Sequence, residues 1–191
     1  MSIEQRTIEQ RTRAWVEVQA SAVRRNLGRV REAMGEDTRL IPMVKADAYG
    51  LGADRLVAAL EPVDPWGYGV AAVSEGLELR RLGVTRPVFV FTPLPPGVYG
   101  DAVEAGLTLC LSDLAGLKRL DEAARRVDPG GPVPFHVEID TGMGRSGFDW
   151  REAEEWGPVV SAHHGRTLRW AGCFTHLHSA DVDAASVRVQ H

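Results

Sequence analysis

Short apolar segments alternate with amphipathic helical patterns along most of the chain. Apolar residues recur every three to four positions from Ala20 to Met34 and again over 53–60, 74–82, 97–105, 113–127 and 150–163, which predicts six helices. Strands are predicted to begin near Arg39, Gly67, Pro87, Leu107, Val133 and Arg169. This alternation is typical of repeated βα units and a parallel sheet, so the sequence predicts an α/β fold.

The spacing of the predicted strands favours a barrel that the chain does not complete. From residue 39 to residue 169, successive strands begin about 26 residues apart, close to the roughly 30 residues per unit of an eight-unit barrel. At this pace, eight units would need about 56 residues beyond His191. The sequence therefore predicts a partial TIM (β/α)8 barrel of about six βα units. A complete six-stranded doubly wound sheet is the alternative, because the chain length of 191 residues also suits that fold.

The N-terminal segment differs from the rest of the chain. Ile3–Thr7 is repeated in tandem as Ile8–Thr12, and so polar a segment buries too little apolar area to offset the entropy lost on ordering. We therefore expect residues 1–13 to be a disordered tail and residues 14–191 to form the incomplete barrel. Trp15 to Val18 predicts a short strand before the barrel.

Composition and charge argue against nucleic acid and membranes as binding partners. The chain is 44% hydrophobic and 25% charged, with a formal net charge of −4 and no basic block, which argues against a nucleic-acid partner. The sequence has no apolar run of about 20 residues and no signal peptide, so we expect a cytoplasmic protein without membrane contact. Cys110 and Cys173 lie in apolar runs and are expected to be reduced, unpaired and buried.

Candidate chemistry lies where the predicted strands end. Lys45 shares a strand face with Met43 and Ile41, which would put an amine above aliphatic groups at the barrel mouth, the setting that a Schiff-base lysine requires. Further along, His136, Glu138 and Asp140 share one face of a strand, and a glycine-spaced turn returns Arg145 toward these carboxylates. An exposed lysine and a glycine-rich capping loop are the ordinary structural alternatives.

The sixth predicted strand ends in two histidines. His176 and His178 lie two positions apart, as in a two-histidine metal site, with His163, His164 and Asp181 as further candidate ligands. No cysteine or glutamate lies nearby at a ligand spacing, so we assign no metal site and expect hydrogen-bonding roles for these imidazoles.

Three motifs together give the chain a specific resemblance. VKADAYGLGA, EIDTGMGRSGF and FTHLHSAD occur in this order at strand ends, and the chain from Trp15 to His191 resembles the N-terminal barrel domain of alanine racemases, fold-type III pyridoxal-phosphate enzymes. The resemblance implies racemisation of L-alanine and D-alanine with pyridoxal 5'-phosphate, a homodimer when the protein is complete, and D-alanine supply for peptidoglycan. It also assigns the strand at 15–18 to a separate β domain.

The resemblance also implies roles for individual residues. Lys45 resembles the lysine that forms the internal aldimine and then acts as one base. Tyr49 resembles the tyrosine that binds the cofactor phosphate. Arg145 resembles the arginine that contacts the cofactor's phenolic oxygen and the substrate carboxylate, and His176 the histidine beside the cofactor. Glu138 stands where many members carry a carbamylated lysine, so we expect its carboxylate to pair with Arg145.

Several points stay open. The family's second base is a tyrosine from the partner subunit's β domain, which no residue of this chain matches, so we expect the chain alone to be inactive. Racemases of other amino acids, decarboxylases or aldolases of the same fold type, a non-catalytic pyridoxal-phosphate-binding barrel and a metal-dependent barrel hydrolase are the alternatives.

Overall fold

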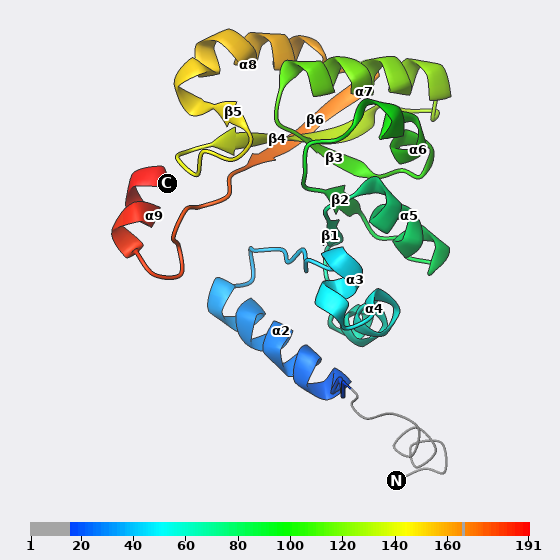
Figure 1. Cartoon of the computed structure of the whole chain (residues 1–191), viewed down its shortest axis with the longest axis vertical. Coiled ribbons are helices and arrows are strands. Elements are labelled where there is room, and N and C mark those ends of the chain that lie inside the picture. The colour runs from blue at the N-terminus through cyan, green and yellow to red at the C-terminus, as the bar shows by residue number, and fades with distance from the viewer. Residues whose placement is uncertain (1–15, 166) are drawn as a thin grey trace.

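The centre of the molecule is a parallel six-stranded sheet (Figure 1). The structure is a computed structural model that describes residues 16–165 and 167–191. The strands are β1 (Tyr68–Val70), β2 (Val88–Val90), β3 (Thr108–Leu111), β4 (Val133–Asp140), β5 (Phe148–Asp149) and β6 (Leu168–Phe174). The strands β1, β2, β3, β4 and β6 pair in chain order, and the two-residue β5 pairs with the carboxyl end of β4.

This topology distinguishes between the two predicted folds. A doubly wound sheet reverses its strand order and carries helices on both faces. Here the strand order is sequential, and α5 (Val73–Arg81), α6 (Tyr99–Glu104), α7 (Leu114–Val127) and α8 (Ala153–Ala162) follow one side of the curved sheet (Figure 1). The partial barrel is therefore confirmed.

The remaining helices lie at the ends of the chain and around β1. They are α2 (Ala20–Met34), α3 (Lys45–Gly50), α4 (Ala53–Leu60) and α9 (Ala184–Gln190), with short 3-10 turns at Glu61–Val63, Pro96–Val98 and Trp150–Glu152. The bounds predicted for α2 and α4 are confirmed, and those of α5 and α7 agree to within one residue. Neither α9 nor β5 was predicted, because each is too short to show periodicity.

The first predicted strand is present only as a sparsely bonded segment. It lies beside β1 through one bridge, Met43 to Gly69, and its bonds include Gly69 N–H to Pro42 O at 2.9 Å and Val44 N–H to Gly69 O at 2.8 Å. Pro42 has no amide hydrogen, so a regular ladder cannot form through this position. The segment still occupies the first strand position of the barrel.

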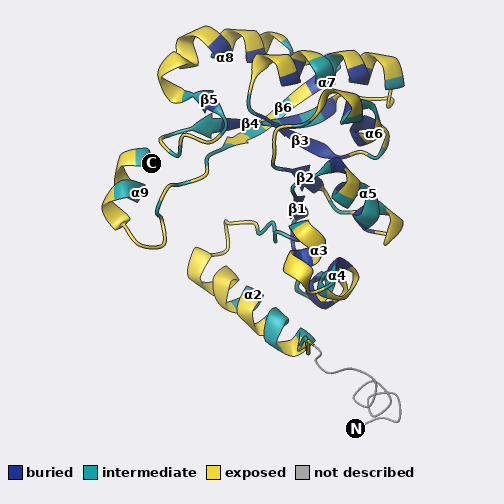
Figure 2. Ribbon diagram, in the orientation of Figure 1, coloured by how far each residue is buried: buried dark blue, intermediate teal, exposed yellow. Residues whose placement is uncertain are grey.

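The two faces of the sheet carry different side chains. Alternate residues such as Val88, Val90, Leu109, Phe135 and Val137 are almost fully buried in the hydrophobic core (Figure 2). The opposite, inner face is largely aromatic, and the contacts between its rings join Trp66, Phe89, Phe91, His136 and Phe174. The inner face therefore forms an aromatic wall.

The Arg80 guanidinium links two successive βα units at the amino edge of the sheet. Arg80, near the end of α5, donates to the carbonyls of Val84 and Arg86 ahead of β2, at 2.7 and 2.8 Å. It also donates to the carbonyls of Ala105 and Gly106 ahead of β3, at 2.9 and 3.0 Å. Four carbonyls from two successive loops are thus held by one side chain.

Two expectations about the chain ends and cysteines need correction. Val16–Val18 has no regular secondary structure, because no described strand pairs with it, and Trp15 and the expected 1–13 tail lie outside the described residues. Cys110 is free and buried, but Cys173 is free and exposed. Along β6, Cys173 lies on the opposite face from Gly172 and Phe174, and the described helices leave the Cys173 face uncovered. None of the helices in the described ranges is long and apolar enough to cross a bilayer.

Candidate functional site

Lys45 begins a left-handed turn at the carboxyl edge of the sheet. The four residues that follow it, Ala46 to Tyr49, have φ angles from 51° to 58°. The left-handed conformation costs L-residues roughly 1–2 kcal/mol each, because Cβ approaches the following carbonyl oxygen. Such a turn persists only where surrounding contacts hold it.

The turn is held by bonds at both of its ends. Val44 O accepts the amide hydrogen of Ala48 at 2.9 Å, and the Asp47 carboxylate accepts that of Ala53 at 2.7 Å. Within the turn, the Lys45 ammonium lies 5.8 Å from the centroid of the Tyr49 ring. Tyr49 is 62% exposed, so its hydroxyl is available to a ligand.

Glu138 has a different partner from the one that the sequence suggested. Its carboxylate is 2% exposed and accepts hydrogen bonds from Ser112 Oγ at 2.7 Å and Ser146 Oγ at 2.9 Å. Among the described residues, no ion pair joins Glu138 to Arg145. The expected direct pairing is therefore corrected: Glu138 is linked to the Arg145 loop through Ser146, because the serine hydroxyls lie closer to the buried carboxylate than the exposed guanidinium does.

The loop that carries Arg145 is organised by Asp140, the last residue of β4. Its carboxylate accepts the amide hydrogens of Gly142 at 2.9 Å and Gly144 at 3.0 Å. These bonds, chiefly that from Gly144, hold the pKa of Asp140 below its ordinary value. The loop closes at Gly147, which has a φ of 119° and lies against the backbone of β4.

Glu138, Arg145 and His176 line one small pocket. β4 supplies Glu138, the following loop supplies Arg145, and His176 lies two residues beyond β6. The ends of the two strands are tied together by the hydroxyls of Thr141 and Thr175, 2.8 Å apart. Glu138 and Arg145 from one motif and His176 from another are thus brought together at the carboxyl ends of β4 and β6.

Lys45 and Tyr49 lie at the same edge but form a separate group. Their turn follows the first strand position, whereas the pocket lies at β4 and β6, and no described contact joins the two groups. Because every strand is parallel, both groups are at the carboxyl edge, where barrel enzymes hold their active sites.

The aromatic wall lies below this edge. The Phe91 and Phe174 rings meet edge to face, with centroids 5.0 Å apart, and Phe89 meets His136 in the same way at 5.3 Å. Burial, with a smaller contribution from Arg169, lowers the pKa of His136, so this imidazole is neutral near pH 7. The wall therefore offers flat apolar surface to a ligand at the mouth.

The other histidines make local contacts. His163 Nδ1 lies 2.9 Å from Val159 O, and His164 Nδ1 accepts the amide hydrogen of Trp170 at 3.2 Å. His178 Nδ1 lies 2.7 Å from Ser179 Oγ. Over residues 16–165 and 167–191, no three His, Cys, Asp or Glu side chains are arranged to hold a metal ion.

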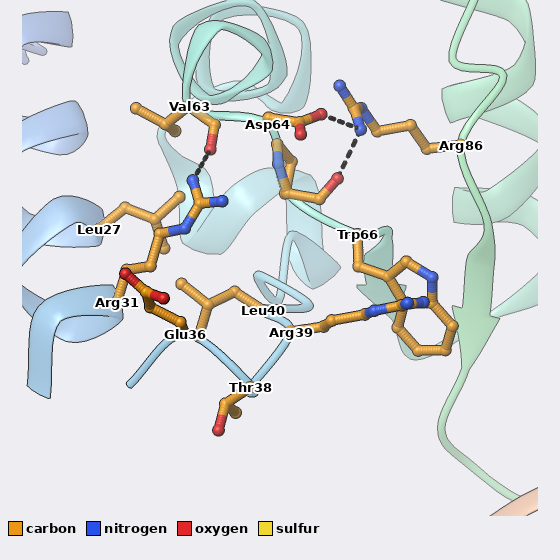
Figure 3. A pocket seen from close by; sticks show the side chains of 11 residues that line it. Leu27, Arg31, Glu36, Thr38, Arg39, Leu40, Val63, Asp64, Trp66 and Arg86 are labelled. Atoms are coloured by element: carbon orange, nitrogen blue, oxygen red, sulfur yellow. Dashed lines mark hydrogen bonds and ion pairs between the residues drawn. The ribbon is translucent and has the colours of Figure 1, made fainter. Parts of the chain in front are cut away.

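A cavity lined by none of these residues lies beside α2 (Figure 3). Its volume is about 370 Å³, and it separates α2 from the amino ends of β1 and β2. Arg31 crosses it to donate to Val63 O at 2.8 Å, Arg86 pairs with Asp64 at 2.8 Å, and Arg39 lies over Trp66. Because its three arginines already make contacts and it lies at the amino edge, we place the candidate site at the carboxyl edge.

Sequence reasoning missed Ser112, Ser146 and Glu75. Ser112 directly follows β3, so its place at a strand's carboxyl end was a usable signal. Glu75 is the third residue of α5 and accepts the amide hydrogen of Ala72 at 3.1 Å, one half of a capping box. A helix-capping glutamate gives no sign in the sequence of a second, distant partner.

Comparison with known proteins agrees with this geometry. Residues 18–191 match the family described as the alanine racemase N-terminal domain. An alanine racemase of Citrifermentans bemidjiense is 32% identical over 166 residues, covering 87% of this chain and 43% of the relative. One of Synechocystis is 34% identical, covering 94% of this chain and 48% of the relative. The chain thus spans less than half the length of these relatives.

Solved structures give the same result. The alanine racemase of Clostridium difficile 630 matches with a TM-score of 0.80 at 30% identity, covering 88% of this chain and 44% of that one. A histidine racemase of Leuconostoc mesenteroides matches with a TM-score of 0.79 at 27% identity, covering 90% and 45%. With residues 18–191 matched, the chain belongs to the alanine racemase family through its N-terminal domain.

Proposed function

We propose that the protein interconverts L-alanine and D-alanine with pyridoxal 5'-phosphate bound covalently to Lys45. One observation carries this proposal: the Lys45 turn and the pocket of Glu138, Arg145 and His176 share the carboxyl edge of a partial barrel that belongs to this family. Barrel enzymes assemble their reacting groups from different strands at this edge.

The donor set fits pyridoxal phosphate. A primary amine at Lys45 suits its aldehyde, the exposed Arg145 guanidinium suits its phenolic oxygen, and the Tyr49 hydroxyl suits its phosphate. His176 would lie beside the ring, and the aromatic wall below the edge offers apolar surface. When bound, the cofactor supplies an electron sink that makes the substrate α-proton acidic.

Proton transfer and substrate orientation are the roles of the side chains. The amine of Lys45 would act on one face of the substrate α-carbon: it removes the proton there in one direction of the reaction and delivers it there in the other, while Arg145 orients the substrate carboxylate. Glu138 positions Arg145 through Ser146, the next residue in the chain. The base for the opposite face is not assigned to any residue of this chain.

The setting of this activity is also part of the proposal. We place the protein in the cytoplasm as a homodimer, without membrane or nucleic-acid partners, where it supplies D-alanine for peptidoglycan. The net charge of −4 and the absence of a basic block support the lack of a nucleic-acid partner.

Racemisation of another amino acid is the second candidate, and the likeness to a histidine racemase favours it. The two candidates share Lys45 and differ in substrate. In an active racemase that contains this chain, chiral chromatography of the enantiomers formed from L-alanine, L-serine, L-lysine and L-histidine distinguishes the two candidates. A faster rate with any amino acid other than alanine would overturn the alanine assignment.

The two lysines of the chain allow an internally controlled test. Lys45 is the candidate, whereas Lys118 lies on α7 with a side chain that is 78% exposed. The protein is incubated with pyridoxal phosphate, reduced with borohydride, digested and analysed by mass spectrometry. We expect the pyridoxyl group on Lys45 in large excess over Lys118, and loss of that label in Lys45→Arg.

The matched control is Lys118→Arg, which should keep the label on Lys45. Equal labelling of the two lysines, or preferential labelling of the more exposed Lys118, would contradict a built cofactor site at Lys45. Because we expect the chain alone to be inactive, activity is measured in an active racemase that contains this chain. Lys45→Arg that kept the wild-type rate there would contradict the assigned base.

A further inference from the structure

Glu75 connects helix α5 to the turn that carries Lys45. Its Oε1 accepts the amide hydrogen of Ala46 at 2.6 Å, from 29 residues earlier in the chain. Its Oε2 accepts the amide hydrogens of Ala71 at 2.8 Å and Ala72 at 3.1 Å. One carboxylate thus joins three amides from two separate loops at the carboxyl edge.

The bond to Ala46 fixes the backbone beside Lys45. On the amino side of Lys45, Val44 donates its amide hydrogen to Gly69 O at 2.8 Å. On the carboxyl side, Ala46 donates to Glu75. Lys45 is therefore held between two anchored neighbours, one tied to β1 and the other to the start of α5.

The turn has an intrinsic tendency to leave this conformation. Ala46 to Tyr49 all have positive φ, and none is glycine, so each favours a right-handed or extended backbone when released. Ala46 is the first of these residues, and its amide is held by the Glu75 side chain rather than by its own turn. Loss of this bond would free the turn at the residue next to Lys45.

We infer that Glu75 is a positioning residue that holds the Lys45 amine in place for pyridoxal phosphate; this rests on the proposed function. A hydrogen bond to a charged acceptor is stronger than a neutral one, so a carboxylate suits this task. Glu75 acts through the backbone of Ala46 and does not itself contact the cofactor.

Shortening the side chain isolates the bond to Ala46. Glu75→Asp keeps a carboxylate in the first turn of α5, where it can still accept nearby amide hydrogens and favour the helix N-terminus, but it retracts by one methylene from Ala46. Glu78→Asp is the matched control, since Glu78 lies on the same helix and pairs with the exposed Arg81. Glu75→Gln is a second variant that keeps one oxygen acceptor.

The first readout is the ratio of borohydride-fixed pyridoxyl label on Lys45 to that on Lys118. We expect this ratio to fall about tenfold in Glu75→Asp, the size that loss of a charge-assisted hydrogen bond implies, with Glu78→Asp unchanged. The second readout needs no cofactor: amide hydrogen exchange at Ala46 should become faster in Glu75→Asp, while exchange in α7 stays as in the wild type.

A wild-type ratio and wild-type exchange at Ala46 in Glu75→Asp would overturn the inference. The same holds if the ratio falls only in proportion to a general loss of stability, measured by thermal denaturation. If Glu75→Asp does not fold, the two readouts are taken on Glu75→Gln. Its single neutral oxygen replaces two charged acceptors and its NH2 group cannot accept, so we expect a smaller fall in the label ratio and faster exchange at Ala46, and no change in either would overturn the inference.

Failure of the proposed function has a different signature. In that case the wild-type protein shows no preference for Lys45 over Lys118, whereas exchange at Ala46 still responds to Glu75→Asp. Adding Ala46→Gly to Glu75→Asp provides a rescue test, because glycine adopts positive φ without the Cβ penalty. Partial recovery of the label ratio supports the inference, and no recovery contradicts the step that invokes the turn.

Discussion

Replacing Gly147 by alanine tests whether the Arg145 loop depends on close contact with β4. Gly147 has a φ of 119°, and a Cβ added there would lie 2.7 Å from Asp140 N, 3.0 Å from Ile139 C and 3.2 Å from Glu138 O. These are backbone atoms of a strand that pairs with both β3 and β6. The strand cannot move away without disturbing its ladders.

The expected loss of stability has two parts. Positive φ at a residue with Cβ costs about 1–3 kcal/mol, and forcing atoms into a packed strand adds about 1–3 kcal/mol. Gly147→Ala should therefore lower the free energy of unfolding by about 2–6 kcal/mol, with about 4 kcal/mol as the middle of this range. Gly144→Ala, in the same loop, carries only the backbone cost of about 1 kcal/mol, because its φ is 71° and no atom lies within 4 Å of the position that the new methyl group would take.

Urea denaturation followed by circular dichroism measures both values. With a slope of about 2 kcal/mol per molar urea, the Gly147→Ala midpoint should fall by about 2 M and that of Gly144→Ala by about 0.5 M. Gly131→Ala, at an exposed glycine without positive φ and with open space around it, should change little. Equal midpoints for the two loop variants would refute the argument from close contact.

Two further predictions concern pH and helix capping. Burial lowers the pKa of His136, so the unfolded chain binds more protons just below the ordinary value of about 6.5; the free energy of unfolding should fall as pH decreases through this window. In His136→Gln, the free energy of unfolding should depend less steeply on pH in this window, and an unchanged dependence would exclude His136 as the cause. Asp113 accepts the Gly116 amide hydrogen at 2.6 Å at the start of α7, so Asp113→Ala should cost about 1 kcal/mol in urea denaturation. Asp113→Asn should retain most of that stability, and an equal loss in both variants would contradict the capping role.

The helices and most strands could be predicted because their signals are local. Ala20–Met34 shows helical periodicity and ends at Gly35, whose φ of 82° glycine adopts freely. β4 and β6 are the longest strands of the described sheet, with apolar residues on at least one face, and their order along the chain is their order in the sheet. The grouping of Arg145 and His176 at strand ends follows from the same parallel topology.

The features that could not be predicted depend on distant or unusual backbone contacts. None of the residues Ala46–Tyr49 is a glycine, so the sequence does not indicate the left-handed turn there. Ser112 lies 26 residues before Glu138, so nothing local indicated that it would bind the carboxylate in place of Arg145. Pro42 lacks the amide hydrogen that a regular ladder requires, but the strand predicted from Arg39 did not take this into account.

Helix α5 has a consequence for engineering barrels of this kind. Its Glu75 collects amide hydrogens at one rim of the sheet, and its Arg80 collects carbonyls at the other, partly from the loop before β3. A block exchange that ended between β2 and Ala105 would transplant the guanidinium with only two of the four carbonyl groups that it binds in this chain. Chimeras should therefore be joined after Gly106, so that donor and acceptors are inherited together.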